Sequence, residues 1–271
     1  WNRAEIFSKR LAPIQVNYLG YPGTMGSEFI DYIIADEIII PKKYTNNYLE
    51  KIIYLPDCYQ PNVKNKKISN KNFKRNDFDL PNKSFVFCNF NSNHKITPKT
   101  FSIWMKILKE VPDSVLWLLK SNSLASENLW KEAKKRNIEK NRIIFAEYMP
   151  NDQHLERIKL ADLFLDTFPY NAHTTASDAI RMGIPIITLM GKSFASRVSS
   201  SILNQVNLNE LVTTNKDDFK NLAINLAKDK KKLKKVKDSL KNSLSKSALF
   251  DSVKYTGDLE NIFLKLLNEK N

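Results

Sequence analysis

The sequence has few of the residues that mark a secreted, metal-binding or membrane protein. Only two of its 271 residues are cysteines, Cys58 and Cys88, and their spacing fits neither a disulfide framework nor a zinc motif. The longest apolar runs, such as "IIADEIII" and "LADLFLDTF", contain acidic residues, whereas a membrane span needs roughly 20 apolar residues. No basic-then-apolar leader opens the chain. We therefore expect a folded cytoplasmic protein with no membrane partner.

Acidic residues are also in the minority: 43 Lys and Arg face 29 Asp and Glu, giving a net charge of +14. Clustered basic residues are typical of proteins that bind nucleic acids, because they displace counterions from phosphates. Much of the excess lies in "KNKKISNKNFKR" and "KDKKKLKKVK", where lysines alternate with Asn or recur along a predicted helix. Solvated lysine-rich surfaces explain this pattern equally well, so a nucleic-acid-binding module stays the weaker alternative.

From residue 85 onward, short apolar runs alternate with helical patterns. Strands are predicted at residues 85–90, 114–119, 142–148, 162–168 and 184–191, and helices at 97–111, 126–137, 151–161, 174–183 and 194–206. Thr97 followed by Pro98 predicts one helix start, and Gly183 predicts one helix end. Strands that alternate with helices in this way predict a parallel sheet with helices on both faces.

The two ends of the chain depart from this alternation. The stretch "IQVNYLGYPGTMG" predicts a strand and a glycine-containing loop, and residues 61–84 have the Lys- and Asn-rich composition of a linker. From Lys216 the pattern is helical. It ends in an apolar stripe that we expect to pack on another part of the protein: Leu259, Ile262, Phe263, Leu266 and Leu267. We predict two lobes, residues 1–80 and 81–271.

The stretch "YNAHTTASDAI" places His173, Thr174 and Thr175 at the predicted start of a helix that follows a strand. Ligands of such sheets lie beyond the carboxyl ends of the strands, and a helix start offers free N–H groups to a phosphate. Asp178, one turn into the helix, is placed to accept a hydrogen bond from a ribose hydroxyl. Alternatively, one threonine is only an N-cap and His173 is an ordinary surface residue.

The other two histidines, His94 and His154, also lie at strand-to-helix connections of this lobe. Scattered surface histidines would not share this placement, which favours a binding site at one sheet edge. Lys95 adds a point charge suited to a phosphate, although an ordinary exposed lysine is the alternative.

Two short motifs carry less weight. The loop "YPGTMG" matches neither glycine-rich phosphate-binding pattern. "DFD", from Asp77 to Asp79, is similar to the acidic motif of metal-using sugar transferases, but it lies in the predicted linker without a strand leading into it. Hard cations need several convergent oxygens, so no metal site is predicted.

Long ordered segments resemble the catalytic region of the O-GlcNAc transferase family, bacterial type, which includes SPINDLY-like O-fucosyltransferases. They include "FCNFNSNHKITPKTFSIWMKILKEVPDSVLWLL" and "NRIIFAEYMPNDQHLERIKLADLFLDTFPYNAHTTASDAIRMGIPIITLMG". The resemblance implies an α/β fold of GT-B type with two Rossmann-like lobes. It also implies an inverting glycosyltransferase with no cofactor or catalytic metal, which moves N-acetylglucosamine from UDP-GlcNAc to Ser or Thr of a protein acceptor. GDP-fucose as the donor is the alternative.

The same resemblance assigns roles to individual residues. Lys95 and His173 are the expected catalytic groups at the donor diphosphate, which Thr174 and Thr175 also bind, and Asp178 is expected to bind the ribose. The base is expected to contact His154, Arg157 and the backbone around Met149. The sugar side of the cleft is expected to contain Leu19, Gly20 and Pro22.

The sequence departs from the family pattern at several points. Ser92 and Asn151 stand where the animal enzymes carry Gln and Lys, so two donor contacts are expected to differ. The chain opens at Trp1 without a Met, inside the region where the family's amino-terminal lobe has already begun. We therefore expect an incomplete amino-terminal lobe, upstream tetratricopeptide repeats that are absent here, and nucleotide binding without efficient sugar transfer.

Overall fold

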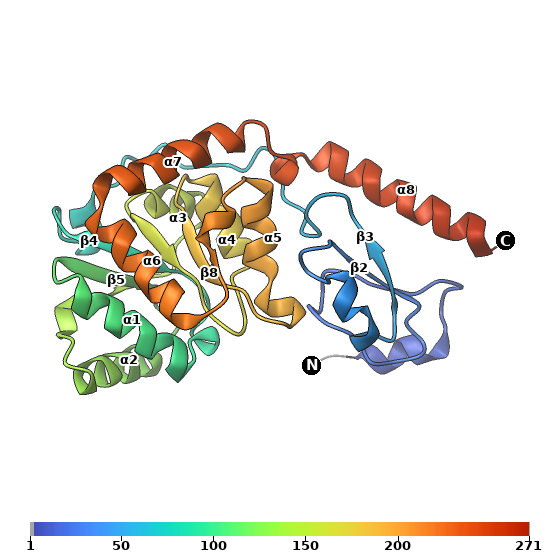
Figure 1. The fold of residues 1–271 in the computed structure, drawn as a ribbon, viewed down its shortest axis with the longest axis horizontal. Coiled ribbons are helices and arrows are strands. Elements are labelled where there is room, and N and C mark those ends of the chain that lie inside the picture. Colours follow the sequence, from blue (N-terminus) through green and yellow to red (C-terminus); the bar gives the residue numbers. More distant parts are fainter. Residues whose placement is uncertain (1–2, 271) are drawn as a thin grey trace.

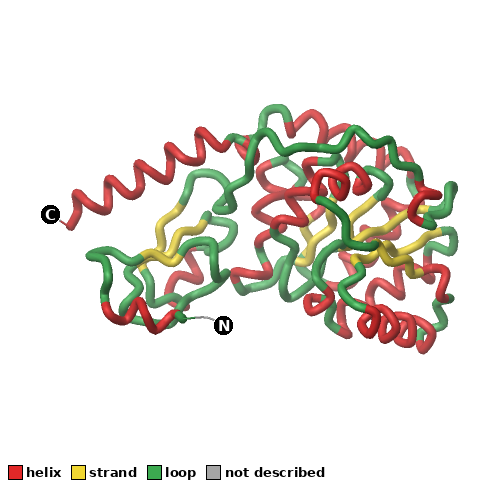
Figure 2. The backbone as a smooth tube through the Cα atoms, turned by 180° about the vertical axis from the view of Figure 1, so that it is seen from behind, coloured by secondary structure: helices red, strands yellow, loops and turns green. Residues whose placement is uncertain are grey.

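The computed structural model describes residues 3–270 and contains two parallel β-sheets. The prediction that the chain opens inside the amino-terminal lobe concerns Trp1, which lies outside the described residues. The smaller sheet has the order β1-β2-β3 and is formed by Val16–Asn17, Tyr32–Ala35 and Lys51–Tyr54. The larger sheet has the order β6-β5-β4-β7-β8-β9. Figures 1 and 2 show the two sheets as separate groups of strands, joined by the chain between β3 and β4.

The larger lobe alternates strands and helices, as the sequence predicts. Its elements are β4 (Phe85–Asn89), α1 (Pro98–Glu110), β5 (Ser114–Leu119), α2 (Ser123–Lys135), β6 (Ile143–Ala146), α3 (Asn151–Ile158), β7 (Leu163–Leu165), α4 (Thr174–Arg181), β8 (Ile186–Leu189), α5 (Val198–Gln205) and β9 (Val212–Thr213). All neighbouring strands pair in parallel. The predicted parallel sheet is therefore confirmed.

The strand order reverses between β4 and β7, which are neighbours in the sheet although two strands separate them in sequence. Right-handed crossovers require the helices before and after such a reversal to cover opposite faces of the sheet. In agreement, α1 packs against α6 (Lys216–Lys228), whereas α4 packs against α3 and α5. A reversal of this kind opens a crevice at the carboxyl ends of the strands, where ligands of Rossmann-type sheets bind.

The predicted helix boundaries rest on local capping interactions. Thr97 caps α1 by accepting a hydrogen bond from the backbone N–H of Thr100 at 3.1 Å. Gly183 ends α4 with a φ of +78°, a backbone conformation that glycine adopts without a steric cost. The second helix starts earlier than predicted, because Asn122 caps it through the N–H of Ala125.

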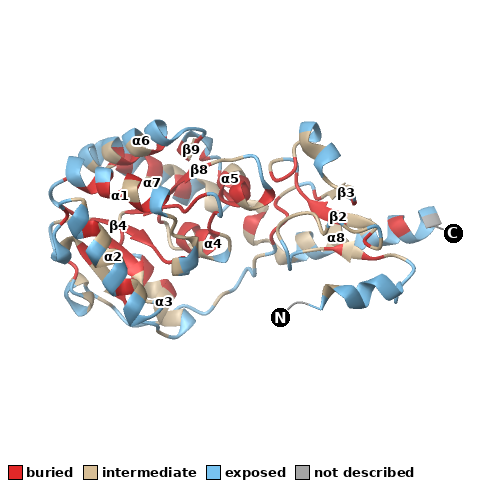
Figure 3. Cartoon of the chain, turned by 90° about the horizontal axis from the view of Figure 1, so that it is seen from below, coloured by how far each residue is buried: buried red, intermediate tan, exposed pale blue. Residues whose placement is uncertain are grey.

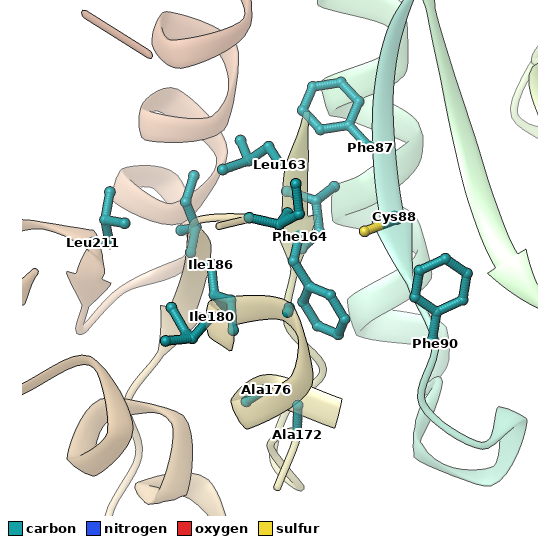
Figure 4. Close-up of a cluster of buried hydrophobic side chains, with 14 of the residues drawn as sticks. Phe87, Cys88, Phe90, Leu163, Phe164, Ala172, Ala176, Ile180, Ile186 and Leu211 are labelled. Carbon is teal, nitrogen blue, oxygen red and sulfur yellow. The ribbon is translucent and has the colours of Figure 1, made fainter. Parts of the chain in front are cut away.

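Large apolar side chains fill the space between the larger sheet and its helices. Figure 3 shows the strands and the inner helix faces as buried and the outer helix faces as exposed. Phe164 of β7 lies in the cluster of Figure 4 with Ala172, from the loop before α4, and with Ala176 and Ile180, from α4 itself. The small alanine side chains let the start of α4 approach the sheet closely.

The carboxyl-terminal tail is helical, as predicted, and forms α6, α7 (Lys230–Leu244) and α8 (Ser252–Lys270). Figure 1 shows α8 extending from the larger lobe along the smaller one. The predicted docking of its apolar stripe is confirmed in part: Leu266 is buried, Leu259 and Ile262 pack against the core, and Phe263 and Leu267 stay exposed. None of the helices in residues 3–270 is long and apolar enough to cross a membrane.

Buried polar contacts join the two lobes. Asp36, which follows β2, accepts hydrogen bonds from the hydroxyl of Ser201 on α5 at 2.6 Å and from the N–H of Tyr59 at 2.9 Å. Arg197 donates to the carbonyl of Ile38 at 2.6 Å. Burial raises the pKa of Asp36, while the hydrogen bonds from Ser201 and Tyr59 stabilise its charged form. The contacts fix the smaller lobe against the start of α5.

Candidate functional site

A cavity of about 370 Å³ lies at the carboxyl edge of the larger sheet, at the reversal between β4 and β7. Its lining comes from the segments that follow β4, β5, β6 and β7, as expected for a crevice at this point of the fold. Most residues of the predicted donor site line it together: Lys95, Met149, His154, Arg157, His173, Thr174, Thr175 and Asp178.

His173, rather than either threonine, is the N-cap residue of α4, and no side chain among the described residues caps this helix. The threonine N-cap alternative is therefore wrong. The helix start leaves N–H groups available to a ligand, at the positive end of the helix dipole. His173 Nε2 is buried and has no hydrogen-bond partner in residues 3–270. Burial, and secondly the charge of Lys95, lower the pKa of His173 to about 4, so its ring is neutral at pH 7.

Lys95 is not an ordinary exposed lysine. Its Nζ donates a hydrogen bond to the carbonyl of Asn171 at 2.9 Å and lies 4.1 Å from the ring centroid of Tyr170. The Tyr170 ring also stacks on the His173 ring, with centroids 5.1 Å apart. Burial lowers the pKa of Lys95 to about 8, opposed by the negative charge of Asp166. The cationic Lys95 and the neutral imidazole of His173 therefore lie close together beside the start of α4.

Asp166 is a residue that the sequence reasoning missed. It follows β7 and accepts hydrogen bonds from the N–H groups of Thr167 and Ala172, both at 2.8 Å, and from the hydroxyl of Thr188 at 2.7 Å. Burial raises its pKa to about 6, although these donors favour the charged form. The available signal was an acidic residue directly after an apolar strand, at the edge where ligands bind.

The other end of the cavity is aromatic. Arg157 is buried with its guanidinium 5.7 Å from the ring centroid of Phe90 and 5.9 Å from that of Trp117. It donates to the carbonyl of Glu147 at 2.6 Å and to His154 Nδ1 at 3.0 Å. Because Nδ1 accepts, the proton of the neutral His154 ring is on Nε2. Burial, then the charges of Arg157 and Lys66, lower the pKa of His154 to about 4.

Polar partners position the remaining lining residues. Thr175 Oγ1 donates to Asn91 Oδ1 at 2.5 Å, and Asn91 Nδ2 donates to Thr167 Oγ1 at 2.9 Å. Asp178 is not free to bind a ligand with its whole carboxylate, because Lys66 Nζ lies 2.6 Å from its Oδ1. Neither Asn91 nor Lys66 was predicted.

Other candidates lie outside this group. His94 is exposed in a short 3₁₀ helix and does not line the cavity. Gly20 lines a different cavity, in the smaller lobe, and neither Leu19 nor Pro22 lines the cavity at the sheet edge. Ser92 and Asn151, the two departures from the family pattern, both line it.

The acidic "DFD" motif has a local structural contact. Asp77 accepts a hydrogen bond from the backbone N–H of Lys74 at 2.8 Å and so caps a short 3₁₀ helix, Arg75–Phe78. The described residues contain no group of three or more His, Cys, Asp or Glu side chains arranged to bind a metal ion.

The arrangement suits a ligand with an anionic centre and a planar ring. Lys95, the Nε2 atom of His173 and the start of α4 offer positive charge and hydrogen-bond donors at one end. Phe90, His154 and Arg157 offer flat faces and a donor at the other end. Asp178 is the one carboxylate among the described residues that line the cavity, and a carboxylate is suited to accept hydrogen bonds from hydroxyl groups.

Comparisons with known proteins give a family match over most of the chain. The pattern of glycosyl transferase family 41 matches residues 1–70 and 62–259. A probable UDP-N-acetylglucosamine–peptide N-acetylglucosaminyltransferase SEC from Arabidopsis thaliana is 36% identical over 98% of this chain and 28% of its own length. A probable enzyme of the same description, SPINDLY from Petunia hybrida, is 33% identical over 97% of this chain and 28% of its own length. The chain thus spans less than a third of these relatives.

Among solved structures, a mutant O-GlcNAc transferase from Thermobaculum terrenum superposes with a TM-score of 0.83 and 27% sequence identity. The match covers 95% of this chain and 49% of that chain. The predicted GT-B type fold is confirmed by this likeness together with the two parallel sheets described above.

Proposed function

The chain belongs to glycosyl transferase family 41, and from this premise we propose that it forms the donor-binding region of a protein O-GlcNAc transferase. The reaction transfers N-acetylglucosamine from UDP-GlcNAc to Ser or Thr hydroxyls of a protein acceptor. The names of the relatives support both the donor and the peptide acceptor.

The observation that carries this proposal is the buried, unpartnered Nε2 of His173, as seen within residues 3–270. A buried polar atom without a hydrogen bond is costly, so its presence at a cavity wall favours a ligand that satisfies it. The charge of Lys95 acts on the His173 ring, and the adjacent backbone is the uncapped start of α4. An anionic oxygen of a diphosphate is suited to all three.

In the proposed reaction the acceptor hydroxyl attacks the anomeric carbon of the sugar. A new carbon–oxygen bond forms as the bond from that carbon to the β-phosphate oxygen breaks, the hydroxyl proton is released to water, and configuration is inverted. Negative charge grows on the departing UDP, so Lys95, His173 and the start of α4 stabilise the transition state more than the ground state. These groups are positioned before the ligand arrives, which limits the reorganisation needed during the reaction.

The rest of the cavity fits the nucleoside. Phe90 and the His154 ring pack edge to face at 5.0 Å and give an apolar wall for a base. We assign the uracil to this wall, with the His154 Nε2–H, Arg157 and the Met149 backbone around it. Asp178 binds the ribose. Leu19, Gly20 and Pro22 lie outside this cavity, and their assignment to the sugar side of the cleft follows from the family resemblance alone.

We further propose that donor binding needs no metal or cofactor, because Lys95 and the dipole of α4 already offset the diphosphate charge. A cytoplasmic location is proposed from the free buried thiols of Cys58 and Cys88, which form no disulfide in the described structure.

Calorimetric titration of the chain with UDP, GDP and a DNA duplex tests the proposal. We expect UDP to bind and the other two to bind far more weakly. Tighter binding of GDP would move the donor to a guanine nucleotide sugar, and tight binding of the duplex would favour the nucleic-acid alternative. No binding of UDP would refute the proposed function.

A further inference from the structure

The segment between the lobes is fixed to the two helices whose starts line the donor cavity. Arg181, at the end of α4, donates hydrogen bonds to the carbonyls of Lys64, at 2.9 Å, and Val63. Further along, the N–H of Ser69 donates to the carbonyl of Asp152 on α3 at 3.1 Å. The stretch from 63 to 69, which we term the strap, therefore spans from α4 to α3, the two helices whose starts line the cavity.

Lys66 lies in the middle of the strap and turns its side chain to the cavity wall. Its Nζ is 2.6 Å from Asp178 Oδ1, and the two side chains are only 21% and 10% exposed. The positive charge of Lys66 also acts on the ring of His154, where it contributes to the lowered pKa. Lys66 is thus close to a carboxylate and an imidazole that both line the donor cavity.

A purely structural role for the ion pair, holding the strap in place, does not account for this arrangement. The strap backbone is already anchored on both sides of Lys66, through Arg181 and Asp152. The pair does, however, constrain Asp178. Both oxygens of a carboxylate accept hydrogen bonds. Because Lys66 holds Oδ1, the orientation of the carboxylate is fixed, and Oδ2 can accept another hydrogen bond from one direction.

We propose that Lys66 is a positioning residue of the donor site, which orients Asp178 so that Oδ2 accepts a hydrogen bond from the ribose of the nucleotide. This inference rests on the proposed function and deepens it, because it makes the strap a part of donor selection. Charge-assisted hydrogen bonds favour a fixed geometry, and an ion pair with little exposure to water is screened weakly. Loss of Lys66 leaves a carboxylate without its cation and free to rotate away from the ligand.

The test is titration of UDP and of 2′,3′-dideoxy-UDP into the wild type, Lys66→Met and Lys66→Arg. Lys67→Met is the matched control, because Lys67 is the neighbouring lysine and is exposed. We expect Lys66→Met to weaken UDP binding about tenfold, the effect of one hydrogen bond to a charged group. The dideoxy analogue, which lacks the ribose hydroxyls, should bind Lys66→Met and the wild type equally. Lys66→Arg should restore most of the preference for UDP.

A second measurement reports on Lys66 without any ligand. Removal of its charge in Lys66→Met should raise the pKa of His154, which can be measured by NMR of the imidazole. Lys67→Met should leave the pKa of His154 unchanged. The inference would be overturned if Lys66→Met kept the wild-type preference for UDP over the dideoxy analogue. It would also be overturned if Lys66→Met bound UDP more tightly than the wild type, because Lys66 would then block the ribose. An unchanged His154 pKa would also count against it. Failure of the wild type to bind UDP at all would instead refute the proposed function.

Discussion

Lys95 Nζ donates a hydrogen bond of 2.9 Å to the backbone carbonyl of Asn171, in the loop directly before α4. That loop is fixed internally, because Asn171 Nδ2 donates to the carbonyl of Thr167 at 2.8 Å and Thr167 Oγ1 donates to the carbonyl of Tyr170 at 2.7 Å. The lysine therefore reaches from the segment after β4 to the segment after β7 and is positioned before any donor binds. A preorganised cation is the main requirement for stabilising a departing diphosphate.

Replacing this cation should weaken nucleotide binding strongly. We expect Lys95→Ala to lose about 1.5–3 kcal/mol of UDP affinity, the usual range for a hydrogen bond to a charged group. This corresponds to roughly a 10- to 150-fold higher Kd in a calorimetric titration. Lys99→Ala on the exposed side of α1 is the control for loss of one positive charge. Affinity like that of the wild type in Lys95→Ala would remove Lys95 from the site.

The lowered pKa of Lys95 predicts how donor binding depends on pH. In the free protein this pKa is about 8, and an anionic diphosphate beside the ammonium should raise it in the complex. The affinity from the charged lysine is then fully present below about pH 8 and is lost as the pH rises through the pKa of the complex. His154 and His173 have pKa values of about 4 and stay neutral in this range.

We therefore expect the affinity for UDP-GlcNAc to be constant from pH 6 to 7.5 and to fall above pH 8, by at most about tenfold per pH unit for one proton. UDP-GlcNAc is preferable to UDP here, because the terminal phosphate of UDP itself titrates at about pH 6. A fall in affinity below pH 7 instead would show that a histidine or the nucleotide controls binding.

The larger sheet could be predicted from sequence because its strands are short apolar runs separated by capped helices. Thr97, Pro98 and Gly183 act through local backbone geometry, so the sequence alone determines the boundaries they set. β2, β3 and β9 were missed. β2 is a run of only four residues that ends directly before Asp36. β9 has only two residues, and β3 is half exposed, so these two strands do not produce the apolar run of a buried strand.

The common location of the cavity-lining residues on helix starts could also be predicted, because parallel strands bring the segments after them to one edge. Lys66 could not, since its position depends on how the strap folds across α3 and α4, and its surroundings in sequence are other lysines. Asp178 was predicted correctly as part of the cavity lining, but its ion pair with Lys66 joins residues 112 positions apart. Contacts of this kind come from the tertiary structure and leave no local pattern.

Donor binding should not depend on a divalent metal. Lys95 and the start of α4 already supply positive charge to a diphosphate, and Asp77 is engaged with the backbone of Lys74. Titrations of UDP with EDTA and with added Mg²⁺ should give the same Kd within error. A large loss of affinity on chelation, restored by Mg²⁺ or Mn²⁺, would instead return Asp77 and Asp79 to consideration as ligands.

Asp166 should set the charge state of Lys95 without touching the donor. The negative charge of Asp166 keeps the pKa of Lys95 from falling further. Asp166 also accepts hydrogen bonds from the N–H groups of Thr167 and Ala172, which hold the loop before α4. Asp166→Asn keeps an acceptor oxygen for these N–H groups, while the Thr188 hydroxyl can rotate to accept from the new amide. The variant therefore removes charge with little change of shape.

In Asp166→Asn we expect the pKa of Lys95 to drop below 8, so the fall in UDP-GlcNAc affinity with rising pH should begin at a lower pH than in the wild type. Burial raises the pKa of Asp166 to about 6, which means that its charged form is disfavoured in the folded protein. For a carboxyl group this sign means that stability is lost as the pH rises from the unfolded-state pKa of about 4 to about 6 and stays lower above it, so the Tm of the variant at pH 7.5 should equal or exceed that of the wild type. Asp217→Asn, an exposed carboxylate on α6, is the charge-matched control and should leave the pH profile unchanged. If Asp166→Asn also left the profile unchanged, with a lower Tm, Asp166 would act only in holding the loop.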